Sequence, residues 1–73
     1  MRTPVIYVPL LEEGTEAWRQ TTGEEISKNV FKVHPTPFYN AEKEHWQFLP
    51  GSLVKCILVV RDGKKVLVAV KEV

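Results

Sequence analysis

The chain ends in two apolar, β-branched segments on either side of an Asp62-Gly63 pair. Asp-Gly readily adopts the positive φ angles of a two-residue turn, so residues 52–61 and 64–70 are predicted to form a β-hairpin. Since both segments are apolar over most of their length, this hairpin must supply a large part of a hydrophobic core. The hairpin therefore predicts a small, mainly β domain.

The size and composition of the chain limit what else it can contain. It has 73 residues, of which 44% are hydrophobic and 26% charged, and residues 1–73 are predicted to form a single small β domain. Cys56 is the only cysteine and is expected to be a buried thiol in a reducing compartment. The N-terminal segment resembles no signal peptide and no apolar run is long enough for a membrane span, so a cytoplasmic protein with no membrane partner is expected.

Three further strands are predicted before the hairpin. The first covers residues 4–11, where Pro9 restricts it to an edge or a bulge. The second begins at residue 16 and continues past a bulge at Gly23 toward Ile26. Residues 30–33 form a short third strand.

The connections consist of tight turns and one longer loop. Turns are predicted at residues 12–15, 27–29 and 49–51, and Asn40 is a plausible N-cap for a short helix over residues 41–46. Five short strands joined in this way indicate an SH3-like barrel or a bent antiparallel sheet with one short helix or turn.

The hairpin raises the question of what covers its second apolar face. A two-residue turn predicts the pairs Val60–Lys65, Val59–Val66, Leu58–Leu67, Ile57–Val68, Cys56–Ala69 and Lys55–Val70. Both faces of the hairpin are then apolar, and only one can line the domain interior. The internal candidates to cover the other are the aromatic residues of the central loop, and the external candidates are a partner protein or a second copy of the chain. Those aromatic residues are Phe38, Tyr39, Trp46 and Phe48.

Side chains suited to catalysis are sparse and scattered. His34, His45 and Cys56 lack the close pairing of zinc ligands, and Cys56 lies in an apolar strand where burial suppresses its reactivity. The glutamates lie beside turns or on the expected helix, and the glycines fit separate turns rather than a phosphate-binding loop. We therefore expect no catalytic residue, no metal site and no cofactor.

Charge is distributed unevenly along the chain. Residues 1–54 carry five basic and seven acidic side chains, whereas residues 55–73 carry five basic and two acidic ones. Arg61, Lys64 and Lys65 could contact the phosphates of a nucleic acid, or could simply protect strand edges from aggregation.

Three motifs carry a family resemblance. Residues 10–19 read LLEEGTEAWR, residues 46–56 read WQFLPGSLVKC and residues 67–69 read LVA. Together they resemble a group of small uncharacterised bacterial proteins with the pattern LL-x-EG-x-x-x-WR, W-x-F-x-PG-x-x-V-x-C and LVA. The resemblance implies a bacterial, cytoplasmic protein and no particular activity. Gln20 departs from the proline that this pattern has, and the motif positions suggest that Arg19 pairs with Glu12 or Glu44.

These observations favour a non-catalytic protein-interaction module over an enzyme. The expected docking patch combines Tyr7, Trp18, Tyr39 and Trp46. The alternative is a nucleic-acid-binding small β-barrel that uses the three basic residues of the hairpin. An unknown protein is the first partner to consider, with nucleic acid second and a homodimer as a further arrangement.

Overall fold

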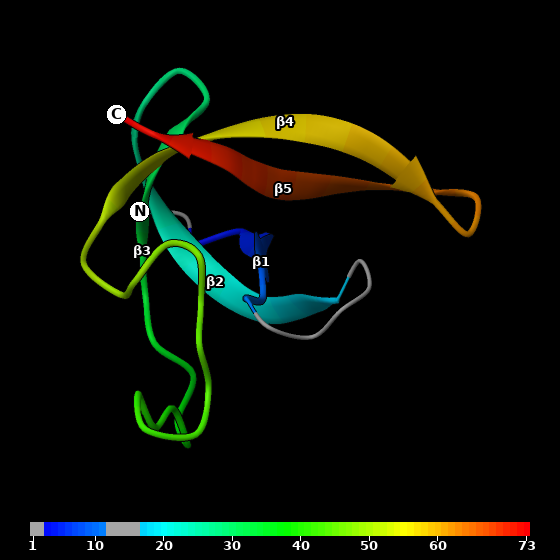
Figure 1. The fold of residues 1–73 in the computed structure, drawn as a ribbon. Coiled ribbons are helices and arrows are strands. Elements are labelled where there is room, and N and C mark those ends of the chain that lie inside the picture. Colours follow the sequence, from blue (N-terminus) through cyan, green and yellow to red (C-terminus); the bar gives the residue numbers. More distant parts are fainter. Residues whose placement is uncertain (1–2, 12–16) are drawn as a thin grey trace.

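Five strands form the structure, a computed structural model that describes residues 3–11 and 17–73 (Figure 1). The prediction of a mainly β chain with five strands is confirmed. In chain order the strands are β1 (Val5–Pro9), β2 (Trp18–Ser27), β3 (Val30–Val33), β4 (Leu53–Arg61) and β5 (Lys64–Glu72).

The strands close into a ring in the order β1-β2-β3-β4-β5. Each strand pairs antiparallel with the next, which places β1 and β5 in the same direction, and they complete the ring as a parallel pair. This closing pair is short, because it joins only Ile6 to Leu67 and Tyr7 to Val68. β4 pairs with β3 only over residues 53–55, so the distal half of the β4–β5 hairpin projects beyond the ring (Figure 1).

The interior of the ring holds the core. The long connection between β3 and β4 contributes Trp46 and Phe48, which are 2% and 6% exposed. Trp46 forms an isolated bridge with Leu10, and the Gln47 amide donates to the Pro9 carbonyl at 2.9 Å. The connection is thereby fixed against the end of β1. The core residues are Ile6, Val8, Phe31, Val33, Trp46, Phe48, Val54, Cys56 and Ala69.

Three predicted turns are confirmed by their backbone geometry. Asp62 and Gly63 have φ angles of 53° and 78°, as a type I′ hairpin turn requires. Asn29 has a φ of 64° in the turn between β2 and β3. The Ser52 amide donates to the Leu49 carbonyl at 3.0 Å and closes the third turn. The turn expected at residues 12–15 lies outside the described residues.

The helix predicted over residues 41–46 is wrong, because only a turn forms at residues 41–43. Asn40 does cap this turn: its Oδ1 accepts from the Glu42 amide at 2.9 Å, and its carbonyl accepts from the Lys43 and Glu44 amides. The turn cannot continue as a helix because Trp46 takes an extended position to pair with Leu10.

Two details of strand register also differ from expectation. Gly23 pairs regularly with Val33, and the irregularity in β2 lies between Glu25 and Ser27 instead. A Cβ at Gly23 would lie 2.9 Å from Ile6 Cδ1, so the absence of a side chain there serves close packing rather than a bulge.

The second difference concerns the base of the final hairpin. Five of its six predicted pairs, from Cys56–Ala69 to Val60–Lys65, are confirmed, and Arg61 pairs with Lys64 next to the turn. The sixth is wrong, because Lys55 pairs with Lys71 rather than Val70. A register shift between Lys55 and Cys56 makes Val70 an extra residue on β5. It lies next to the residues of β4 that also pair with β3.

Candidate functional site

The four aromatic residues of the predicted patch separate into two pairs. Tyr39 packs edge-on against Trp46 with ring centroids 4.8 Å apart, and Trp46 is buried in the core. Tyr7 and Trp18 form the other pair, with centroids 6.2 Å apart on the adjacent strands β1 and β2. Trp46 is therefore not accessible to a partner, whereas Tyr7, Trp18 and Tyr39 are all partly exposed, and Tyr7 and Trp18 lie together.

The tip of the β4–β5 hairpin completes this surface. The Arg61 guanidinium carbon lies 4.4 Å from the centre of the Trp18 ring, close enough for a cation–π interaction. Beside it is a hollow of about 300 Å³, which we call the Tyr7 groove. Its lining residues are Tyr7, Arg61, Asp62, Lys64 and Val66.

The register of the hairpin decides which cations face the Tyr7 groove. Arg61 and Lys64 are cross-strand partners, so their side chains lie on one face of the hairpin. Lys65 pairs with Val60 and lies on the opposite face. Two of the three predicted phosphate contacts therefore line the groove and the third does not.

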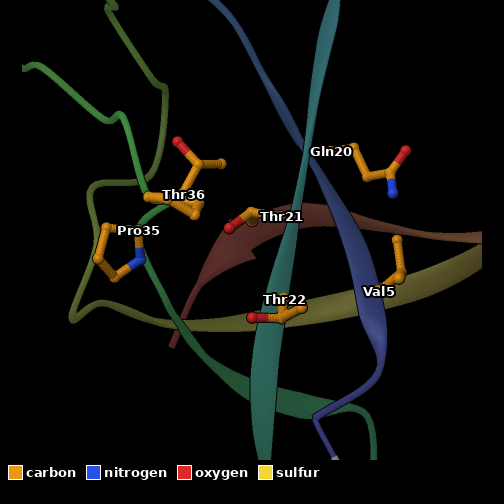
Figure 2. A pocket seen from close by; sticks show the side chains of 7 residues that line it. Val5, Gln20, Thr21, Thr22, Pro35 and Thr36 are labelled. Carbon is orange, nitrogen blue, oxygen red and sulfur yellow. The ribbon is translucent and has the colours of Figure 1, made fainter.

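A second surface lies between β2 and the proline-rich part of the central loop (Figure 2). Its hollow of about 200 Å³ has no charged lining residue among those described, and the Thr21 hydroxyl already donates to the His34 carbonyl at 2.6 Å. The hydroxyls of Thr22 and Thr36 also line the hollow, and the described lining includes no acidic or basic side chain that could activate them. The lining residues are Val5, Gln20, Thr21, Thr22, Pro35, Thr36 and Pro37.

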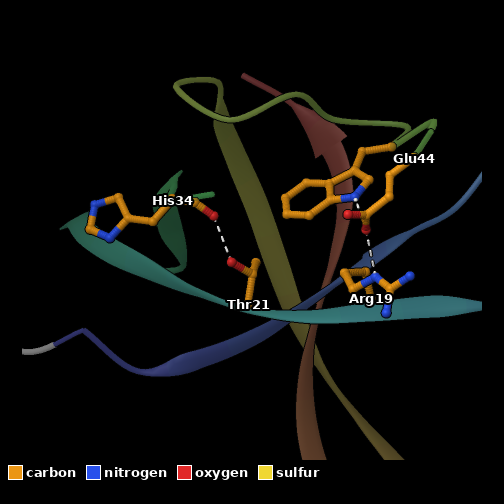
Figure 3. A network of polar contacts seen from close by, with 5 residues as sticks. Arg19, Thr21, His34 and Glu44 are labelled. Atoms are coloured by element: carbon orange, nitrogen blue, oxygen red, sulfur yellow. Dashed lines mark hydrogen bonds and ion pairs between the residues drawn. The ribbon is translucent and has the colours of Figure 1, made fainter. Parts of the chain in front are cut away.

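A neighbouring hollow of about 320 Å³ contains the ion pair between Arg19 and Glu44 (Figure 3). Arg19 Nε lies 2.8 Å from Glu44 Oε1, and the same oxygen accepts from Trp46 Nε1 at 3.2 Å. The predicted Arg19–Glu44 pair is thus confirmed, while Glu12 lies outside the described residues. Because Glu44 connects a surface cation to a core indole, its role is to position the central loop.

Cys56 and the histidines form no reactive cluster. Cys56 is 1% exposed, and desolvation by burial raises the pKa of its thiol from 9.0 to about 11, as expected for an inert core cysteine. His34 Nε2 lies 3.9 Å from Glu24 Oε1. Within residues 3–11 and 17–73, no three His, Cys, Asp or Glu side chains lie together as a group that could hold a metal ion.

The internal candidates for covering the second apolar face of the hairpin do not reach its distal half. Trp46 and Phe48 lie inside the ring and Phe38 is 92% exposed, so the aromatic residues of the central loop do not cover the distal hairpin. Leu58 and Val60 remain 64% and 67% exposed. The contact that does reach the hairpin tip, between Arg61 and Trp18, has no signal in the sequence because two distant segments form it.

Comparison of the chain with protein-family models, with curated proteins and with solved structures found no match. The described residues include no helix with the length and apolar character needed to cross a membrane.

Proposed function

We propose that this protein is a small, non-catalytic protein-interaction module that docks a partner in the Tyr7 groove. The observation that carries the proposal is the stacking of Arg61 on Trp18 beside Tyr7. Aromatic residues and arginine are the side chains most enriched at the energetic centres of protein interfaces. Here Tyr7, Trp18 and Arg61 lie together at the surface, although a chain this small needs large aromatic residues to fill its core.

The charge of the Tyr7 groove indicates the chemistry of the partner. Arg61 and Lys64 contribute two positive charges and Asp62 one negative charge, while Tyr7 and Val66 provide apolar contact. A segment with acidic and apolar side chains complements this surface.

The same proposal includes an SH3-like character, a cytoplasmic location and membership of the bacterial group that the motifs resemble.

Affinity capture with matched variants tests the proposal. The tagged protein and its Trp18→Ala and Phe38→Ala variants are exposed to a lysate of the source organism, with and without nuclease. Phe38 is an exposed aromatic residue outside the Tyr7 groove, so it controls for general loss of apolar surface. We expect a protein that survives nuclease, is lost with Trp18→Ala and is kept with Phe38→Ala. Equal capture by all three proteins would contradict the proposal.

Nucleic-acid binding is the second candidate, because the fold brings Tyr7 and Trp18 next to Arg61 and Lys64. Stacking on aromatic rings combined with phosphate neutralisation is the general mode of single-strand binding. Two cations neutralising two phosphates predict a slope of roughly −1.4 in a plot of log affinity against log salt. Titrating a single-stranded oligonucleotide at several salt concentrations, with tryptophan fluorescence as the signal, separates the candidates. A measured salt slope close to the predicted value favours nucleic acid.

A further inference from the structure

The outer edge of β4 has no strand beside it along the projecting half of the hairpin. Among the described strands, β3 pairs with β4 only over residues 53–55. From Ile57 to Arg61, β4 pairs with β5 alone (Figure 1, yellow). An unpaired strand edge of this length is a template for another strand.

Hydrogen-bond alternation identifies the groups that this edge presents. The Cys56 amide points to the β3 side of β4 and donates to the Asn29 carbonyl at 2.8 Å. Amides of alternate residues point the same way, so the N–H and C=O groups of Leu58 and Val60 also point to the outer edge. Ile57, Val59 and Arg61 direct theirs toward β5, as expected when Arg61 and Lys64 flank a two-residue turn.

The two edges of the projecting hairpin differ in charge. The β5 edge near the tip carries Lys64 and Lys65, a common protection against edge-to-edge pairing. The β4 edge carries four apolar residues in succession, from Ile57 to Val60, and no charge before Arg61. The Leu58 and Val60 side chains on it are more than half exposed. Only the β4 edge therefore lacks protection.

We propose that two copies of this chain associate through antiparallel pairing of their β4 edges, centred on Val59. A two-fold axis perpendicular to the joined sheet leaves a given side chain on the same face of the sheet in both copies. Residues directly opposite each other must therefore both be odd-numbered or both be even-numbered. With Val59 opposite itself, Leu58 of each copy faces Val60 of the other. Both of these pairs are hydrogen-bonded pairs, and together they form four backbone hydrogen bonds and a continuous apolar strip.

The position of β3 selects this register over its neighbour. Pairing centred on Leu58 would place Arg61 of the other copy opposite Lys55, but Val30 of β3 already occupies the outer side of Lys55. Centring on Val59 places Arg61 opposite Ile57 instead and brings the Asp62 end of each hairpin toward Lys55 of the other copy. The edge is thus complementary to itself, which is the reason to assign it to a second copy rather than to a foreign strand.

The contact area predicts the strength of the dimer. Two short strands and their exposed side chains bury less than the roughly 1,200 Å² of total surface that stable complexes require. We therefore expect self-association with a dissociation constant on the order of 100 µM, weak and reversible. Sedimentation velocity from about 10 µM to about 1 mM covers this range. A monomer at every concentration overturns the proposal.

Two matched variants test the location of the interface. Val60→Glu puts a charge on the proposed interface, yet within its own hairpin it faces Lys65 and preserves the fold. Val70→Glu makes the same change at an exposed β5 position, 42% exposed, far from the edge. We expect Val60→Glu to abolish dimerisation and Val70→Glu to keep it. Dimerisation that survives Val60→Glu overturns the proposal.

Cysteine cross-linking tests the register itself. Residues on the two-fold axis form a non-hydrogen-bonded pair with Cα atoms about 4.5 Å apart, within the range of a disulfide. Val59→Cys is therefore expected to form a disulfide dimer, while Leu58→Cys and Val60→Cys alone cross-link at least tenfold more slowly. The wild type, with only the buried Cys56, provides the background. Faster cross-linking of Leu58→Cys or Val60→Cys overturns the assigned register.

Trp18→Ala separates this inference from the proposed function. It removes the ring on which Arg61 stacks beside the Tyr7 groove but leaves the β4 edge untouched, so we expect the dimer to persist. If Trp18→Ala abolishes dimerisation while Val60→Glu does not, the copies associate through the Tyr7 groove and the edge proposal fails.

Discussion

The Arg61 guanidinium carbon lies 4.4 Å from the centre of the Trp18 ring, which joins the tip of the final hairpin to the first residue of β2. Among the described strands, β1 pairs only with Leu67 and Val68 of β5 and does not reach the tip. The contact between Arg61 and Trp18 therefore helps to orient the projecting hairpin and, with it, the Tyr7 groove.

Replacing Arg61 with alanine is expected to lower the free energy of unfolding by about 0.5 kcal/mol, the usual size of an exposed cation–π contact. Arg61→Lys should retain part of this stabilisation because the charge remains while the planar stacking is lost. Urea denaturation measures both changes. Lys71→Ala is the control for loss of an exposed basic residue, and an equal effect from it would deny the contact any stabilising role.

Glu44 is expected to matter more than its ion-pair partner Arg19. Glu44→Ala leaves the indole N–H of buried Trp46 without its acceptor and should cost about 1–2 kcal/mol of unfolding free energy. Arg19→Ala removes only a half-exposed ion pair, worth about 0.5 kcal/mol.

Glu44→Gln separates the two roles of this carboxylate, since it loses the charge but keeps an oxygen acceptor for the Trp46 indole. Its effect should match that of Arg19→Ala rather than that of Glu44→Ala. Thermal and urea unfolding measure all three variants, and equal losses for Glu44→Gln and Glu44→Ala would mean that the ion pair, not the indole bond, dominates.

Gly23→Ala should destabilise the fold by about 1–3 kcal/mol, because its Cβ would approach Ile6 Cδ1 at 2.9 Å and Phe31 Cβ at 3.2 Å. Ile6→Val deletes the atom in closest conflict. The double variant is therefore expected to lose less stability than the sum of the single changes. Strict additivity in this double-mutant cycle would show that the close approach to Ile6 is not the cause.

The raised thiol pKa of Cys56 predicts two linked effects. At pH 8 the folded protein should react with a thiol reagent at least about 100-fold more slowly than the urea-unfolded chain, because the pKa of the thiol is about 11 rather than 9.0 and burial also keeps the reagent from it. The unfolded chain also releases this proton first as pH rises. The stabilisation from the neutral buried thiol is therefore complete below pH 9.0 and lost as pH rises through about 11.

Cys56→Ala isolates this effect from the lysines and tyrosines that titrate in the same range. The difference in unfolding free energy between wild type and variant should shrink between pH 9.0 and about 11. A difference that stays constant over this window would contradict the assigned pKa shift.

Several features could be predicted because their causes are local. Gly63 adopts a positive φ angle because it has no Cβ, and Asp62 and Asn29 do so because their short polar side chains tolerate it, so these residues mark turns. Once the Asp62-Gly63 turn is placed, counting outward gives the hairpin register as far as Cys56. The Arg19–Glu44 pair was accessible only as one of two hypotheses, because charge alone does not choose between acidic partners.

The failed predictions share a different cause. The segment after Asn40 has a cap and helix-forming residues, yet the bridge between Trp46 and Leu10 limits it to a single turn. A glycine inside a strand is typical of a β-bulge, but Gly23 pairs regularly because Ile6 and Phe31 pack where its side chain would be. In both cases contacts between distant segments outweighed a local preference.

The sequence by itself determined the mainly β class, three of the tight turns and the final hairpin, since backbone preferences and apolar periodicity act over a few residues. Only the tertiary structure decided that Trp46 fills the core while Trp18 lies under Arg61 at the surface. The two tryptophans are chemically identical, and what separates them is which strands the ring closure brings beside each one. Burial depends on contacts between segments far apart in the chain, and those contacts exist only in the folded ring.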